Sequence, residues 1–126
     1  MKSKLAPLLL FALTACPSAQ TAGPVIAEGQ ASFYADSLAG NKTANGETYD
    51  PGEDTCAHRK LAFGTVLEVE RVDTGKKAKC RVNDRGPYHD KRIIDLSRAV
   101  AEELEIDGVA KVRLRKLSEP EKKKKK

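Results

Sequence analysis

The stretch TVLEVERVDTGKKAKCRVN, residues 65–83, decides the class of fold. Apolar and polar side chains alternate along its first half, and they alternate again over 77–83, where Ala78, Cys80 and Val82 take the apolar positions. Successive side chains of a β-strand point to opposite faces, so a period of two predicts half-buried strands. The Asp-Thr-Gly between the two halves is typical of a turn. We therefore predict two consecutive strands here, joined by a tight turn.

Further strands are predicted on both sides of this pair. The patterns favour strands at 29–35, 92–96 and 109–117. Many short strands in one small domain, which we place at 28–117, predict a mainly β fold closed into a barrel, because closure leaves no exposed strand edge.

One helix and two long loops complete the predicted domain. Ser97 is a favourable N-cap for a helix that runs to about Glu105 and buries Val100, Ala101 and Leu104. The stretches 36–63 and 84–91 show no regular period. Long loops in a compact domain commonly carry function, so we expect the chemistry there.

The first residues have the features of an exported lipoprotein. Residues 1–15 combine two early lysines with an apolar run that is too short to span a bilayer, which is typical of a signal peptide. The tetrapeptide LTAC ending at Cys16 resembles the bacterial lipobox, and this predicts lipid on the Cys16 thiol and anchoring in a membrane that faces the periplasm or cell wall. Pro17, in place of aspartate, favours the outer membrane in a Gram-negative cell. The alternative is an ordinary signal peptide with a chance cysteine.

The net charge of +5 resides at the two ends of the chain. Lys2, Lys4 and residues 118–126, a predicted disordered tail with five final lysines, account for all of it. Residues 16–27 are rich in small residues and proline and predict a flexible linker. Because the domain itself is balanced in charge, it lacks the basic excess that a nucleic-acid surface needs. We expect a monomer.

The chain has three cysteines. With Cys16 assigned to lipid, Cys56 and Cys80 remain as a pair, and an exported location permits a disulfide between them. Two separate free thiols are the alternative. The spacing of the cysteines is unlike that of metal ligands, so we predict no metal site, and no cofactor motif is present.

Five motifs lie along the domain in the order GxASFY (29–34), TANGExYD (43–50), AHxxLxFGT (57–65), NDRGPY (83–88) and RIIDLS (92–97). Together they resemble the rare lipoprotein A (RlpA) family. The resemblance implies a six-stranded double-psi β-barrel with one short α-helix. It extends more weakly to expansins and to a second class of lytic transglycosylase.

The resemblance also implies an activity. Such a protein is an endolytic lytic transglycosylase that breaks the MurNAc–GlcNAc bond of peptidoglycan, preferably in peptide-poor glycan, and leaves a 1,6-anhydro-MurNAc end. The reaction requires an acid for the leaving oxygen and a base for the 6-hydroxyl, and one carboxyl group can serve as both. It requires no cofactor.

The motif positions give the expected site residues. The catalytic group is expected to comprise Asp84, Glu47, His58 and Asp95. The residues expected to bind the sugar are Asp50, Tyr34, Tyr49, Arg85 and Tyr88. We favour Asp84 as the acid/base, because it directly follows a strand, and Asp95 is the other candidate, because it matches an aspartate of the related barrels.

Each assignment has a structural alternative. Asp84 with Arg85 would then be a bracing ion pair, and Asp95 would bind only loop amides. Likewise, His58 would be a structural histidine and Glu47 a solvated turn residue. At the level of the whole protein, the alternatives are a non-catalytic peptidoglycan-binding or expansin-like wall-loosening lipoprotein, and a hydrolase that uses water. Many RlpA relatives carry a C-terminal SPOR domain; we expect a protein that lacks it, so septal targeting stays open.

Overall fold

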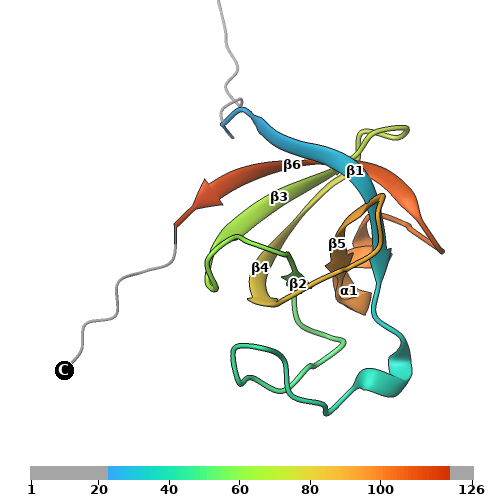
Figure 1. Cartoon of the computed structure of the whole chain (residues 1–126). Coiled ribbons are helices and arrows are strands. Elements are labelled where there is room, and N and C mark those ends of the chain that lie inside the picture. The colour runs from blue at the N-terminus through green and yellow to red at the C-terminus, as the bar shows by residue number, and fades with distance from the viewer. Residues whose placement is uncertain (1–22, 120–126) are drawn as a thin grey trace, which may run out of the picture.

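The computed structural model describes residues 23–119, which form a closed β-barrel with one α-helix packed against it (Figure 1). In chain order the elements are β1 (Val25–Phe33), the 3-10 helix η1 (Asp36–Leu38), β2 (Thr55–Ala57), β3 (Val66–Arg71), β4 (Lys77–Asp84), β5 (Arg92–Leu96), α1 (Arg98–Glu103) and β6 (Ala110–Ser118). The predictions for the signal peptide, Cys16 and the lysine-rich tail fall outside the described residues, except for Ser118, which ends β6, and Glu119, which forms an ion pair with Lys116. None of the described helices has the length and apolar character needed to cross a membrane.

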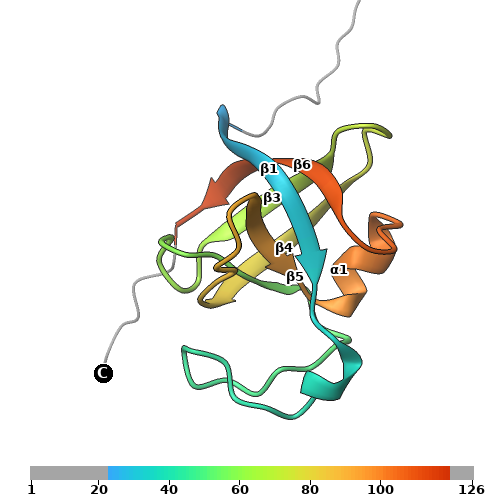
Figure 2. The same ribbon diagram turned by 45° about the vertical axis from the view of Figure 1, so that its right-hand side comes forward.

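The strands follow the order β1-β5-β2-β4-β3-β6 around the barrel. The pairs β1/β5 and β2/β4 are parallel, and the other neighbours are antiparallel. The predicted mainly β class, with a six-stranded barrel and one short helix, is therefore confirmed. Figures 1 and 2 both show the long connection from β1 to β2 extending beyond one end of the barrel.

The core follows from the alternation in the sequence. Leu67 and Val69 of β3 are fully buried against Cys80 and Val82 of β4, while their polar neighbours face outward. The predicted helix cap is also present, because the Ser97 side chain accepts a hydrogen bond from a backbone amide in the first turn of α1. The apolar face of that helix closes one side of the barrel core.

Two sequence predictions need correction. Strand β2 lies inside the stretch 36–63 that was predicted to be irregular; all of its three residues are buried, so no alternation marked it. Strand β1 begins at Val25, so the prediction of a flexible linker as far as residue 27 is wrong for its last three residues. Val25 and Ala27 pair with Arg115 and Leu114 of β6, and backbone pairing of this kind leaves no apolar period in the sequence.

A disulfide links Cys56 of β2 to Cys80 of β4 inside the core, with a Cα–Cα distance of 5.7 Å. It joins two strands that are already parallel neighbours. The bond thereby fixes the end of the long β1–β2 connection to the barrel wall.

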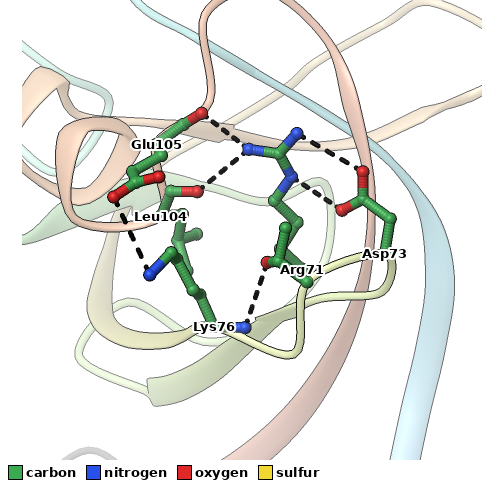
Figure 3. Close-up of polar contacts among 6 residues, drawn as sticks. Arg71, Asp73, Lys76, Leu104 and Glu105 are labelled. Carbon is green, nitrogen blue, oxygen red and sulfur yellow. Dashed lines mark hydrogen bonds and ion pairs between the residues drawn. The ribbon is translucent and has the colours of Figure 1, made fainter.

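Arg71 ties the C-terminal end of α1 to the β3–β4 turn (Figure 3). Its Nη1 donates to the carbonyl oxygens of Leu104, at 3.1 Å, and Glu105, at 2.6 Å, while its Nε donates to Asp73 at 2.8 Å. Both carbonyls lie just beyond α1, which ends at Glu103, so this guanidinium fixes the chain where it leaves the helix.

Candidate active site

A cleft of about 340 Å³ lies beside the C-terminal end of β1, strand β5 and the end of β4. The loop that follows η1 forms its remaining wall. The lining residues are Ser32, Phe33, Tyr34, Ala35, Leu38, Asn41, Lys42, Thr43, Tyr49, Asp84, Arg85, Arg92 and Asp95. Segments far apart in the sequence therefore meet here because the barrel is closed.

Asp84 is the last residue of β4, and its carboxylate accepts three hydrogen bonds. Oδ1 accepts from the backbone amides of Ala44, at 2.8 Å, and Arg85, at 2.9 Å. Oδ2 accepts from the hydroxyl of Tyr34. The Arg85 guanidinium binds elsewhere, so the bracing ion pair considered above is not the role of Asp84.

Tyr34 stands directly after β1 and donates to Asp84. Burial raises the pKa of its phenol, and the hydrogen bond to Asp84 and the neighbouring carboxylate charges raise it further. The phenol therefore stays protonated and acts as a donor. Its ring packs at a tilt against that of Tyr49, with a centroid distance of 4.5 Å.

Asp95 is the second carboxyl group on the cleft. It lies in β5 opposite Ser32 of β1, and the Ser32 hydroxyl donates to its Oδ1. Its partner is thus a side-chain hydroxyl on a neighbouring strand, and loop amides are not what hold it. Asp84 and Asp95 accordingly face one cavity, each with a hydroxyl donor supplied by the same end of β1.

Glu47 does not line this cleft. Its Oε2 forms an ion pair with Arg81 at 3.0 Å, and its Oε1 accepts from the amide of Asn83 at 3.0 Å. The bond from Asn83, followed by the hydrogen bond and charge of Arg81, lowers the pKa of Glu47 against the opposing effect of burial. In this position Glu47 attaches the long loop to strand β4.

The His58 imidazole also lies outside the cleft. Its Nδ1 accepts from the backbone amides of Lys60, at 3.1 Å, and Leu61, at 3.2 Å. Burial, together with the charges of Arg85, Arg59 and Lys60, lowers its pKa. The ring borders a separate shallow pocket beside Ile93. This geometry is that of a structural histidine whose Nδ1 serves as an acceptor for the loop.

The structure places only some of the residues expected to bind sugar in the cleft. Tyr49 is buried, and its hydroxyl accepts from the amide of Arg98 at the start of α1. Arg85 lines the cleft, whereas Asp50 only accepts from the amide of Gly52 in a local turn. Tyr88 is 77% exposed on the loop between β4 and β5, and it does not line the cleft either.

Among the cleft residues that the sequence did not single out, Ser32, Lys42 and Arg92 bear most directly on the chemistry. Ser32 was detectable, because it stands two residues before Tyr34 and side chains two apart on a strand share a face. Lys42 and Arg92 carry no such signal. Across residues 23–119, no three histidine, cysteine or acidic side chains are placed to hold a metal ion.

The arrangement supports acid–base chemistry. Because both backbone donors bind Oδ1 of Asp84, its Oδ2 shares only the Tyr34 hydroxyl and is the oxygen open to proton exchange with a bound molecule. Asp95 supplies a further negative charge on the same cleft, and Lys42 and Arg92 supply positive charges.

Comparison with known proteins identifies the family to which this barrel is similar. A family model described as lytic transglycolase matches residues 26–114. The chain is 51% identical over 94 residues to a Treponema pallidum protein named as a probable endolytic peptidoglycan transglycosylase RlpA, which covers 73% of this chain and 30% of the relative. It is 38% identical over 115 residues to the endolytic peptidoglycan transglycosylase RlpA of Campylobacter jejuni, with 90% and 42% covered. The Vibrio cholerae protein of the same name is 46% identical over 88 residues, with 68% and 34% covered.

These relatives are longer than the chain, which spans less than half of the length of each of them. Among solved structures, a Streptomyces papain inhibitor matches with a TM-score of 0.52 and 23% identity, covering 72% of this chain and 96% of the inhibitor. At that identity, the match concerns the fold alone.

Proposed function

Since the chain belongs to the lytic transglycolase family, we propose that it is an endolytic lytic transglycosylase that cleaves the MurNAc–GlcNAc bonds of peptidoglycan. The observation that carries this proposal is the pair of carboxyl groups, Asp84 and Asp95, on one cleft. The family membership supplies the substrate class, and the cleft supplies groups able to perform the reaction.

In the proposed mechanism, Asp84 acts first as an acid and then as a base. Its Oδ2 gives a proton to the glycosidic oxygen as the bond between that oxygen and C1 of MurNAc breaks. The 6-hydroxyl oxygen of the same MurNAc then bonds to C1, and its proton passes to Asp84. Charge and atoms balance without water, and the products are a GlcNAc end with a free hydroxyl and a 1,6-anhydro-MurNAc end.

The neighbouring groups assist this reaction. Tyr34 and the two backbone amides hold the Asp84 carboxyl in one orientation. The negative charge of Asp95 stabilises the positive charge that develops at the anomeric carbon. Lys42 and Arg92 offer partners for anionic or hydroxyl groups of the glycan.

A digestion experiment tests the function. The full chain is incubated with purified peptidoglycan, with and without stem peptides, beside Asp84→Asn and the control Asp107→Asn, which changes an exposed aspartate outside the cleft. We expect 1,6-anhydro-MurNAc products from the wild type and the control, and none from Asp84→Asn. Reducing ends would identify a hydrolase instead.

A non-catalytic wall-binding protein is the second candidate. The placement of Glu47 and His58 outside the cleft favours it, because two of the four expected catalytic residues then serve structural roles. Pelleting of the protein with peptidoglycan, without release of soluble products from either substrate, would establish this alternative.

We further propose an exported protein held on a membrane, the outer membrane in a Gram-negative cell, by lipid on Cys16. The LTAC sequence after an apolar run supports this. Labelled palmitate should be incorporated into the wild type and lost in Cys16→Ser; labelling of both proteins, or of neither, would contradict the proposal.

A further inference from the structure

Two loops meet at the end of the barrel where Asp84 lies. An arginine side chain of each loop donates hydrogen bonds to backbone carbonyls of the other. Residues 58–64 follow β2, and residues 85–91 connect β4 to β5. Strands β2 and β4 are parallel, and Ala57 pairs with Asp84, so both loops leave the barrel side by side. We call the resulting contact between Arg59 and Arg85 and the two loops the arginine clasp.

Arg59 forms the first half of the arginine clasp. Its Nε donates to the carbonyl oxygen of Pro87 at 2.5 Å, and its Nη2 donates to those of His89, at 2.6 Å, and Arg92, at 2.9 Å. One planar guanidinium thus binds two carbonyls of the second loop and the first carbonyl of β5. A lysine ammonium lacks this rigid fork of donors and does not reproduce the set.

Arg85 forms the second half, in the opposite direction. Its Nη1 donates to the carbonyl oxygens of Leu61, at 2.8 Å, and His58, at 3.2 Å, and its guanidinium lies over the Phe63 ring at 3.9 Å from the centroid. Its backbone amide also donates to Asp84. The clasp therefore connects directly to the carboxyl group in the cleft.

The second loop has no strand pairing across 85–90, and these side-chain bonds connect it to the first loop. It presents the exposed ring of Tyr88, and it leads into Arg92, which lines the cleft. A surface fixed before binding loses less conformational entropy when a ligand arrives.

We propose that Arg59 is a positioning residue for substrate, holding Tyr88 and Arg92 as a preformed glycan-binding surface beside Asp84; this rests on the proposed function. Arg59 does not itself line the cleft. Asp84 keeps Tyr34 and the Ala44 amide as partners whatever happens to Arg59. The loss of Arg59 therefore weakens binding of the glycan and leaves the chemical step in place.

The test compares three variants of the full chain. Arg59→Ala removes the Arg59 half of the clasp, and Arg59→Lys retains only the positive charge. Arg71→Ala is the matched control, because Arg71 also binds two carbonyls but at the far end of α1. With peptidoglycan as substrate, we expect Arg59→Ala to raise KM by about tenfold at nearly unchanged kcat. A tenfold change corresponds roughly to the free energy of one hydrogen bond to a charged group. Arg59→Lys should restore part of the loss, and Arg71→Ala should alter neither constant.

An unchanged KM in Arg59→Ala, or an equal rise in Arg71→Ala, would overturn the inference while leaving the proposed function intact. If the wild type cleaves nothing, the proposed function fails, and co-sedimentation with peptidoglycan then tests the clasp by itself. Weaker pelleting of Arg59→Ala than of Arg71→Ala would support it, and equal pelleting would refute it.

Discussion

Tyr34 donates its phenolic hydrogen to Oδ2 of Asp84, a residue 50 positions further along the chain. Two residues before Tyr34, the hydroxyl of Ser32 donates to Asp95 in the same cleft. Alternate residues of a strand face the same side, so one end of β1 supplies a hydroxyl donor to each of the two acids. The orientation of both acids consequently depends on a short stretch of β1.

Tyr34→Phe tests this dependence. The substitution keeps the ring against Tyr49 and removes only the donor to Asp84. We expect kcat on peptidoglycan to fall by roughly tenfold per folded molecule, because a hydrogen bond to a charged group contributes about 1.5–3 kcal/mol, and we expect the loss of the same bond to lower the thermal midpoint. An unchanged kcat in a normally folded variant would show that Tyr34 does not orient the acid.

His58→Ala distinguishes a structural histidine from a catalytic one. Its Nδ1 accepts two backbone amides, so we expect the free energy of unfolding to fall by about 1–2 kcal/mol, with only a small change in kcat per folded molecule. Urea unfolding and activity at matched folded concentration measure the two effects. A loss of kcat by a factor of about 100 or more at unchanged stability would instead identify His58 as a proton-transfer group.

Glu47 should make the stability of the protein depend on pH in the acid range. Its pKa lies below the ordinary value near 4.5, chiefly because of the hydrogen bond from Asn83. A carboxylate with a depressed folded pKa stabilises the fold above its unfolded pKa, and this contribution is lost as the pH falls through the folded value. We therefore expect the free energy of unfolding to decrease below about pH 4.5, and to decrease less in Glu47→Gln.

Urea unfolding near neutral pH and in acid measures this difference. Glu70→Gln is a useful comparison, because the hydrogen bond from Arg115 likewise lowers the pKa of Glu70 on the outer face of β3. Each variant should remove its own part of the pH dependence. If Glu47→Gln shows the same acid dependence as the wild type, the bonds from Asn83 and Arg81 do not stabilise the ionised carboxylate.

The disulfide between Cys56 and Cys80 should stabilise the domain against unfolding. It closes a loop with a sequence separation of 24, and constraint of the unfolded chain by such a loop contributes about 3 kcal/mol. We expect the double variant Cys56→Ala/Cys80→Ala to lose roughly that amount in urea unfolding. Equal stability of the variant and the wild type under oxidising conditions would contradict this role.

The sequence predicted those parts of the fold that leave a periodic pattern. Strands β3 and β4 alternate because one face of each is buried, and the helix after Ser97 was marked by its cap and its apolar face. Strand β2 has three buried residues and therefore no period. Its position depends on pairing with β4 and β5, which are distant in the sequence.

The sequence predicted the two acids of the candidate site correctly, and it predicted the residues around them less well. Asp95 lies in a strand that the pattern predicted, whereas Asp84 was predicted to follow a strand and is in fact its last residue; both line the cleft. The direction of a side chain on a long loop depends on its tertiary partners. Glu47 turns toward Arg81, and His58 turns toward the amides that follow it, and neither choice can be read from motif spacing.

The strand order of the barrel has a consequence for how the cleft comes into being. Each donor and its acid, such as Ser32 and Asp95, are 50 or more positions apart in the sequence. Contacts between distant parts of a chain slow folding, because the entropy of closing the intervening loops is lost before the contacts form. All residues that line the cleft lie between 32 and 95, so a growing chain holds the complete set only once β5 has been made.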